Sequence, residues 1–295
     1  MMLRKGIHYW ALPENFTLEE KLQLAKNAGF EGIELTILKS GCLQEDSSDE
    51  ELLAIRKEID GKGLELIDIS NTLNWHCSLT SNEKEIRELA KNRIKHQIDI
   101  AEKLGSNAIL ALPGFVGLDF SSNKLFPDVR EYQYDPSNEV IDYDIAYQRA
   151  LEAFFELCSY ARKHSINICI ENIWNHFLIS PLEMKNFIDA IGSEWFGAYF
   201  DTGNVMPIGY PEQWIRILGQ RIKRVHFKDY VRHNAMGSGF VNLLEGDVDF
   251  VKVTEALQKI GYQGWVTVET NASHQYPEHT AYACADALDR ILGIK

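Results

Sequence analysis

Short apolar runs alternate with amphipathic helical patterns along the whole chain, about eight times. Runs of this kind are typical of parallel strands that are buried on both faces. The predicted strands lie near Ile7–Leu12, Gly32–Leu35, Leu64–Ile69, Ala108–Leu112, Ile166–Ile170, Gly197–Phe200, Ile222–Phe227 and Trp265–Val268.

The segments between these strands carry the helical period of hydrophobic positions. The first of them begins with the capping-box pair Thr17 and Glu20. The predicted helices cover Thr17–Ala28, Ser48–Ile59, Asn82–Leu104, part of Ile141–His164, Pro181–Ile191, Pro211–Leu218, Phe250–Ile260 and His279–Leu292. Eight strand–helix units predict a single (β/α)8 TIM-barrel domain over residues 1–295, whose active site lies at the carboxyl ends of the strands.

Four of the later strands end in residue types that bind metals, in the order Glu171, Asp201, His226 and Glu269. A single carboxylate at a strand end is explained by a salt bridge. Four such ends converge on one place above a barrel, where they supply oxygen and nitrogen ligands. This set predicts one divalent metal ion of the Mn, Mg, Co or Zn kind.

The amino-acid composition excludes some classes of partner. The net charge of −13 argues against nucleic acid as a partner, since phosphate backbones are held mainly by Lys and Arg. Five scattered cysteines form no Cys-x-x-Cys pattern, and no apolar run is long enough to span a membrane. We therefore expect a reduced, cytoplasmic protein with no membrane partner.

Two connections are unusually long, at residues 71–81 and 115–140. Both follow strands on the predicted active-site face. The second contains Phe115, Phe120, Phe126, Tyr132 and Tyr134. Long connections in compact domains are usually functional, so we expect this excursion to be a lid or a subunit contact, the latter in a homo-oligomer.

Four motifs resemble those of a known family. They are Glu171-Asn172, Asp201-Thr202-Gly203-Asn204, His226-Phe227-Lys228-Asp229 and Glu245-Gly246-Asp247-Val248-Asp249-Phe250. Together they look like the sugar-phosphate isomerase/epimerase group of the xylose-isomerase-like TIM barrels, over essentially the whole chain. That superfamily includes ketose 3-epimerases, pentulose- and hexulose-phosphate 3-epimerases, inosose dehydratase and endonuclease IV.

The resemblance implies that Glu171, Asp201, His226 and Glu269 bind one divalent metal, with Glu171 and Glu269 as the acid–base pair. It also implies a sugar or sugar phosphate as substrate and places Arg232 at a substrate-binding position. The chain departs from the free-ketose enzymes at Asn204, where they carry a His, and at Phe177, where they carry a Glu. Both departures count against a free ketose as substrate, and at Asn204 the chain looks closer to the pentulose-phosphate epimerases.

Further substrate contacts are expected around this site. Lys228 and Arg232 are candidates for a hydroxyl or phosphate, although Lys228 could instead pair with Asp229 or Glu269, and Arg232 could be a solvated loop residue. Trp75, Trp174 and His8 follow strands closely enough to wall a sugar pocket, with ordinary packing as the alternative. Residues in the usual phosphate corner of this fold are less specific candidates, namely His233, Asn271, Ser273 and His274.

The main hypothesis is a metal-dependent epimerase or isomerase that moves a proton through an enediolate, with Glu171 and Glu269 as the two shuttles. An inosose-type dehydratase or lyase shares the first proton abstraction and remains open. An abasic-site endonuclease is disfavoured by Asn204, where those enzymes carry a further His ligand, and by the acidic balance. A sugar-binding barrel without activity is the last alternative.

Overall fold

The computed structural model describes residues 3–118, 138–232, 239–273 and 275–294, and within them eight parallel strands close into a barrel. The barrel strands are β1 (Arg4–His8), β2 (Gly32–Ile37), β3 (Glu65–Asn71), β4 (Ala108–Ala111), β5 (Asn167–Glu171), β6 (Phe196–Asp201), β7 (Ile222–Phe227) and β10 (Trp265–Val268). Their order around the ring is β1-β10-β7-β6-β5-β4-β3-β2, so each strand pairs with its neighbours in the chain and β1 closes on β10. The TIM-barrel prediction is confirmed.

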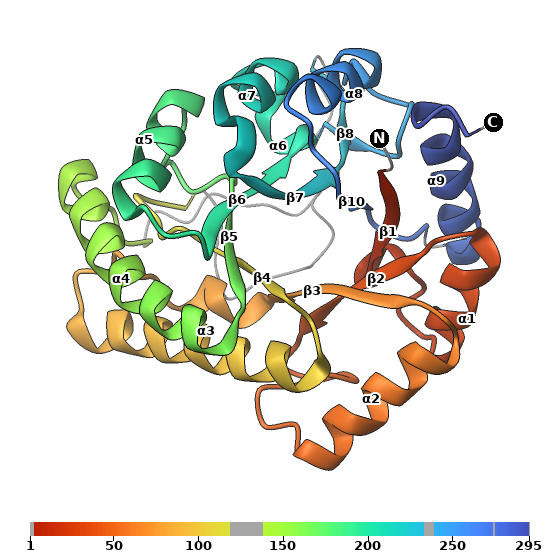
Figure 1. Ribbon diagram of the computed structural model, residues 1–295, viewed down its shortest axis with the longest axis horizontal. Coiled ribbons are helices and arrows are strands. Elements are labelled where there is room, and N and C mark those ends of the chain that lie inside the picture. The colour runs from red at the N-terminus through yellow and green to blue at the C-terminus, as the bar shows by residue number, and fades with distance from the viewer. Residues whose placement is uncertain (1–2, 119–137, 233–238, 274, 295) are drawn as a thin grey trace.

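Helices surround the barrel on the outside (Figure 1). They are α1 (Leu18–Ala28), α2 (Asp49–Gly61), α3 (Lys84–Leu104), α4 (Tyr143–His164), α5 (Pro181–Ile191), α6 (Thr202–Val205), α7 (Pro211–Leu218), α8 (Phe250–Lys259) and α9 (Pro277–Ile291). The last of them, α9, packs beside α1 and completes the ring. No helix in the described ranges is both long and apolar enough to cross a membrane.

The first strand lies earlier than predicted. It covers Arg4–His8, and the chain then turns through a 3-10 helix at Tyr9–Ala11 instead of continuing as a strand to Leu12. The backbone N–H of Trp10 donates to Nδ1 of His8 at this turn. Tyr9, Ala11 and Leu12 are buried like strand residues, and an apolar run alone does not distinguish a buried turn from a strand.

Other local predictions agree more closely. The capping box of Thr17 and Glu20 is formed at the start of α1.

A short hairpin of β8 (Asp229–Tyr230) and β9 (Phe240–Val241) was not predicted. Residues 119–137, which hold Phe120, Phe126, Tyr132 and Tyr134 of the expected lid or subunit contact, lie outside the described residues.

A polar cluster crosses the inside of the barrel. Asp68 of β3 and Tyr199 of β6 are fully buried, and the Tyr199 hydroxyl donates to Asp68 Oδ2 over 3.2 Å. Arg224 Nε of β7 lies 3.2 Å from the same oxygen, and the guanidinium also donates to the carbonyl of Ile67. Burial raises the pKa of Asp68, against the attraction of Arg224. The cluster therefore depends on Arg224 to compensate a buried carboxylate.

Replacement of Arg224 by Met should destabilise the fold by about 3–5 kcal/mol, because it leaves the Asp68 carboxylate buried without its cation. Urea unfolding followed by circular dichroism measures this change. Adding Asp68→Asn to the Arg224→Met variant should recover part of the loss.

Arg290→Met is the matched control. Arg290 makes an ion pair with Asp286 on the surface of α9, and we expect a loss below about 1 kcal/mol there. If Arg224→Met were as stable as Arg290→Met, Arg224 would not compensate the charge of Asp68.

Candidate metal centre

Four side chains from four neighbouring strands meet at the carboxyl end of the barrel. Glu171 and Asp201 are the last residues of β5 and β6, His226 is the penultimate residue of β7, and Glu269 follows β10 directly. Each offers one ligand atom, and these atoms all lie within 4.8 Å of one another. Since the strands are adjacent in the ring and their ends lie level, as Asp201 and His226 do in register, the barrel itself gathers the group.

The imidazole of His226 faces the three carboxylates through Nδ1. This nitrogen lies 3.5 Å from Glu171 Oε1, 3.3 Å from Glu269 Oε2 and 3.8 Å from Asp201 Oδ2. Among the described residues, Nδ1 of His226 and Oδ2 of Asp201 have no hydrogen-bond partner although both are buried. Buried polar atoms are rarely left unsatisfied, so this donor set fits a divalent cation at their common centre.

Burial makes the group electrostatically costly. It raises the pKa of Asp201 well above its usual value and also raises the pKa of Glu171. Burial acts in the same direction on Glu269, but Lys228 and His226 outweigh it and hold the pKa of Glu269 well below its usual value. Positive charge thus decides which carboxylates ionise, and a bound cation would favour ionisation of all three.

Lys228 is the cation that the chain itself supplies. Its Nζ lies 3.0 Å from Glu269 Oε2 and 3.9 Å from Asp201 Oδ2, and it sits over the rings of Trp174 and Phe240. Of the two pairings weighed for Lys228, the one with Glu269 is present. The ammonium therefore stands at the edge of the ligand group and still faces the cavity.

Two asparagines hold the ligands in place. Asn172 and Asp201 exchange two hydrogen bonds of 2.9 Å, from the Asn172 amide to the Asp201 carbonyl and from the Asp201 N–H to the Asn172 side chain. The N–H of Asn204 donates to Asp201 Oδ1, and its side-chain amide donates to Glu171 Oε1. These contacts fix both carboxylates, as partners behind metal ligands commonly do.

Gly203 allows the strand ends to approach. A Cβ at this position would lie 2.9 Å from Cγ of Lys228 and 3.1 Å from its backbone carbon. Thr202 beside it donates through Oγ1 to the carbonyl of Lys228 and accepts from the Lys228 N–H. The Asp-Thr-Gly-Asn motif therefore holds the ends of β6 and β7 close together.

A cavity of about 300 Å³ opens above the ligand group. Five of the residues predicted to contact a substrate line it, namely His8, Trp75, Trp174, Asn204 and Lys228. Its apolar lining residues include Leu110, Leu112 and Ile173, and its polar ones include Asn242, Glu245, Thr270 and Asn271. A cavity of this size, with a few convergent polar groups, suits a small polar molecule.

Arg232 is not among the described lining residues of this cavity. Its guanidinium donates to the backbone carbonyls of Met206 and Gly209 and stacks on the ring of Tyr210. Contact of Arg232 with a substrate stays a prediction. His233 and His274 lie outside the described residues, and Ser273 donates its N–H to Thr280 Oγ1.

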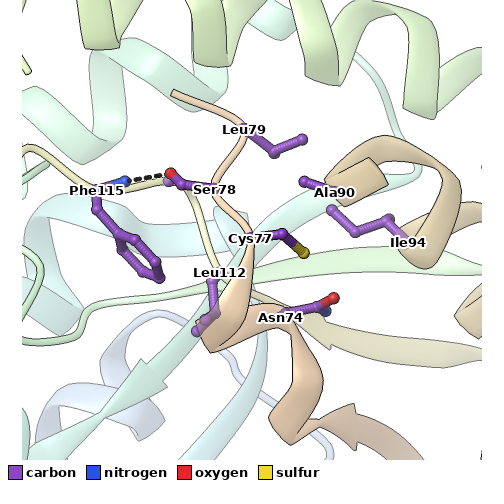
Figure 2. A pocket seen from close by; sticks show the side chains of 9 residues that line it. Asn74, Cys77, Ser78, Leu79, Ala90, Ile94, Leu112 and Phe115 are labelled. Carbon is purple, nitrogen blue, oxygen red and sulfur yellow. Dashed lines mark hydrogen bonds between the residues drawn. The ribbon is translucent and has the colours of Figure 1, made fainter. Parts of the chain in front are cut away.

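A second, much smaller cavity lies between the connection after β3 and helix α3 (Figure 2). Its volume is about 10 Å³, and apolar side chains such as Leu79, Ala90 and Ile94 form much of its wall. Ser78 closes one side by accepting a hydrogen bond from the N–H of Phe115. This space holds one water molecule at most, so the larger cavity is the candidate site.

Glu34 was not predicted from the sequence, and Asp229 was named only within a motif and as a possible partner of Lys228. Glu34 is fully buried in β2, and its Oε2 lies 2.7 Å from Nε2 of His226. Asp229 is fully buried and accepts hydrogen bonds from the N–H groups of Gly246 and Val248, which ties the loop after β9 to β8. A charged residue inside or directly after an apolar strand was the available signal in both cases.

Comparison with known proteins agrees with this fold. A sequence model of the family described as Xylose isomerase-like TIM barrel matches residues 22–290. The chain is 27% identical to SgbU of Haemophilus influenzae, to which L-ribulose-5-phosphate 3-epimerase activity is provisionally assigned, over 90% of this chain and 87% of that protein. It is 25% identical to the L-ribulose-5-phosphate 3-epimerase UlaE of Escherichia coli, over 90% and 86%.

Solved structures are similar in fold. The D-psicose 3-epimerase of Clostridium cellulolyticum H10, crystallised with D-tagatose, superposes with a TM-score of 0.74 at 18% identity, covering 98% of this chain and 99% of that one. At this identity the likeness concerns the arrangement of the barrel.

Asp201→Ala should abolish metal binding, because it removes a fully buried ligand whose Oδ2 has no hydrogen-bond partner among the described residues. Elemental analysis of the purified variant should show loss of the bound divalent metal. Thermal unfolding gives a second readout, since Mn²⁺ at 100 times its Kd should stabilise the wild type by about 2.7 kcal/mol and leave the variant unchanged.

Glu85→Ala is the control, because Glu85 is an exposed carboxylate on α3. This variant should keep both the metal and the Mn²⁺-dependent stabilisation. Retention of one metal per chain by Asp201→Ala would contradict the ligand assignment.

Proposed function

The chain belongs to the xylose isomerase-like TIM barrel family, and on that premise we propose that it is a divalent-metal-dependent ketose phosphate 3-epimerase. The observation that carries the proposal is the buried ligand group with two glutamates at its two ends. In the ring, Glu171 on β5 and Glu269 after β10 are separated by β6 and β7, and both line the cavity. A substrate above the barrel axis would therefore have one glutamate on each side.

Epimerisation next to a carbonyl removes a proton from one face of a carbon and returns a proton to the other face. When bound, a divalent cation supplies a Lewis acid for the sugar oxygens. Glu171 Oε1 and Glu269 Oε2 face Nδ1 of His226, so each glutamate has its other oxygen for the substrate. We assign proton removal to one glutamate and proton return to the other. Which of the two epimers is bound decides which glutamate removes the proton.

The residues around Glu171 and Glu269 support the same proton transfer. Asn204 holds Glu171 by a hydrogen bond of 3.2 Å, and Lys228 holds Glu269 at 3.0 Å. The rings of Trp75 and Trp174 line the cavity, where they would keep water from an enediolate. Each proton carrier thus has its own polar partner within an otherwise enclosed site.

The phosphorylated substrate is supported by the names of the relatives. SgbU and UlaE both carry L-ribulose-5-phosphate 3-epimerase in their names. In addition, Phe177, which stands where the resemblance to free-ketose enzymes calls for a Glu, packs in the core against the rings of Tyr143 and Phe187. This chain therefore has an apolar residue at that position, turned into the core.

Glu171→Gln and Glu269→Gln should each lower epimerisation by about 10²–10⁴-fold, because a neutral amide neither accepts nor returns the proton. The measurement is exchange of the C3 proton of a pentulose 5-phosphate with D₂O by NMR. Loss of water from the substrate without epimer would instead indicate the dehydratase reaction.

Glu245→Gln is the matched control, since Glu245 lines the same cavity but is not one of the four ligand residues. Its exchange rate should stay within about tenfold of the wild type. If both Glu171→Gln and Glu269→Gln exchanged as fast as Glu245→Gln, the acid–base assignment would be wrong.

Phosphate preference is tested with matched substrates. The value of kcat/KM for a pentulose 5-phosphate should exceed that for the free pentulose by at least about tenfold, equivalent to 1.4 kcal/mol. Arg232→Ala should raise KM for the phosphate more than for the free sugar. Equal kcat/KM for the two substrates would exclude phosphate recognition.

A further inference from the structure

Glu34 lies directly behind the candidate metal centre. It belongs to β2, on the opposite side of the ring from β6, and is fully buried. It is not among the described residues that line the cavity, and its carboxylate makes three close approaches. Oε2 lies 2.7 Å from Nε2 of His226 and 2.9 Å from the Tyr199 hydroxyl, and Oε1 lies 3.2 Å from Nε2 of His8.

The contact with His226 sets where the imidazole carries its proton. An ionised carboxylate only accepts hydrogen bonds, so a 2.7 Å contact with Nε2 requires a proton on Nε2. In the neutral ring, Nδ1 is then unprotonated. That nitrogen is the one facing Glu171, Asp201 and Glu269, and its lone pair is therefore available to a cation.

Glu34 also contacts a second buried polar side chain, Tyr199. The Tyr199 hydroxyl lies within hydrogen-bond distance of both Glu34 Oε2 and Asp68 Oδ2, and its ring is 4.2 Å from the His226 ring, centroid to centroid. Arg224 compensates Asp68 from the other side. A chain of contacts thus runs from Arg224 through Asp68, Tyr199 and Glu34 to His226.

We propose that Glu34 is a positioning residue, which fixes the tautomer and the ring orientation of His226 and thereby sets the affinity of the site for its divalent metal. Glu34 acts through His226 and makes no contact with the cavity. The inference rests on the metal ligands alone and not on the identity of the sugar. Its tests therefore use metal binding and the imidazole itself, without substrate.

The first test needs no variant. Nitrogen-15 NMR of the histidine rings in wild-type protein loaded with diamagnetic Zn²⁺ should show His226 protonated at Nε2 and unprotonated at Nδ1. A signal assigned to His226 with its proton on Nδ1 alone would overturn the proposal.

The second test compares Mn²⁺ affinities, measured by electron paramagnetic resonance of the free ion. Glu34→Leu removes the acceptor and should weaken Mn²⁺ binding by about 10–100-fold, the usual effect of losing a partner behind a metal ligand. Glu34→Gln keeps an oxygen that can accept from Nε2, so it should recover a large part of the affinity.

Asp68→Asn is the matched control. Asp68 is also fully buried and also bonded to Tyr199, but the described structure gives it no hydrogen bond to His226. Its Mn²⁺ affinity should stay within about threefold of the wild type, well below the loss expected for a metal-ligand partner. An affinity of Glu34→Leu equal to that of Asp68→Asn would overturn the proposal.

The tests of Glu34 can fail or succeed independently of the test of the proposed epimerase function. A wild-type protein that binds Mn²⁺ but exchanges no ketose proton contradicts the epimerase proposal, while the ratio of Mn²⁺ affinities still decides the role of Glu34. If Glu34→Leu fails to fold, the ratio for Glu34→Gln and the wild-type tautomer decide it.

Discussion

The structure depends on keeping three buried carboxylates within coordination distance of one another. Glu171, Asp201 and Glu269 repel when ionised, and burial removes the water that would screen them. Backbone pairing of adjacent strand ends holds them together regardless of that repulsion. The chain itself supplies positive charge beside this group through Lys228, and a bound divalent ion would compensate the rest.

A second consequence of burial is found deeper in the barrel. Polar side chains in a core are tolerated only when they are bonded, and here each one bonds the next, from Arg224 to Asp68 and through Tyr199 to Glu34. An apolar core of the same volume would fit the barrel as well and leave His226 without its partner. The stability lost by burying these polar side chains is therefore linked to the positioning of His226 as a metal ligand. In the described structure, Glu34 is the member of this network that hydrogen-bonds His226.

The cavity combines apolar and polar surface. Leu110, Leu112 and Ile173 are among its apolar lining residues, and Asn242 and Thr270 are among its polar ones. A ketose, the proposed substrate, has carbons and hydroxyls that would contact both kinds of residue. On the proposed function, specificity between related ketoses would depend on residues of the loops above the strands, and the proton transfer would depend on the strand ends.

The sequence by itself determined the barrel and four ligands, because both are repeated local signals: apolar runs of strand length, and a metal-binding residue type at the end of four of them. It placed the first strand too late, since a buried 3-10 turn at Tyr9–Ala11 has the same hydrophobicity as a strand. Only the tertiary structure decided that Glu34, 192 residues from His226, bonds its far nitrogen. No local pattern encodes that contact, because strands on opposite sides of a ring meet only when the ring closes.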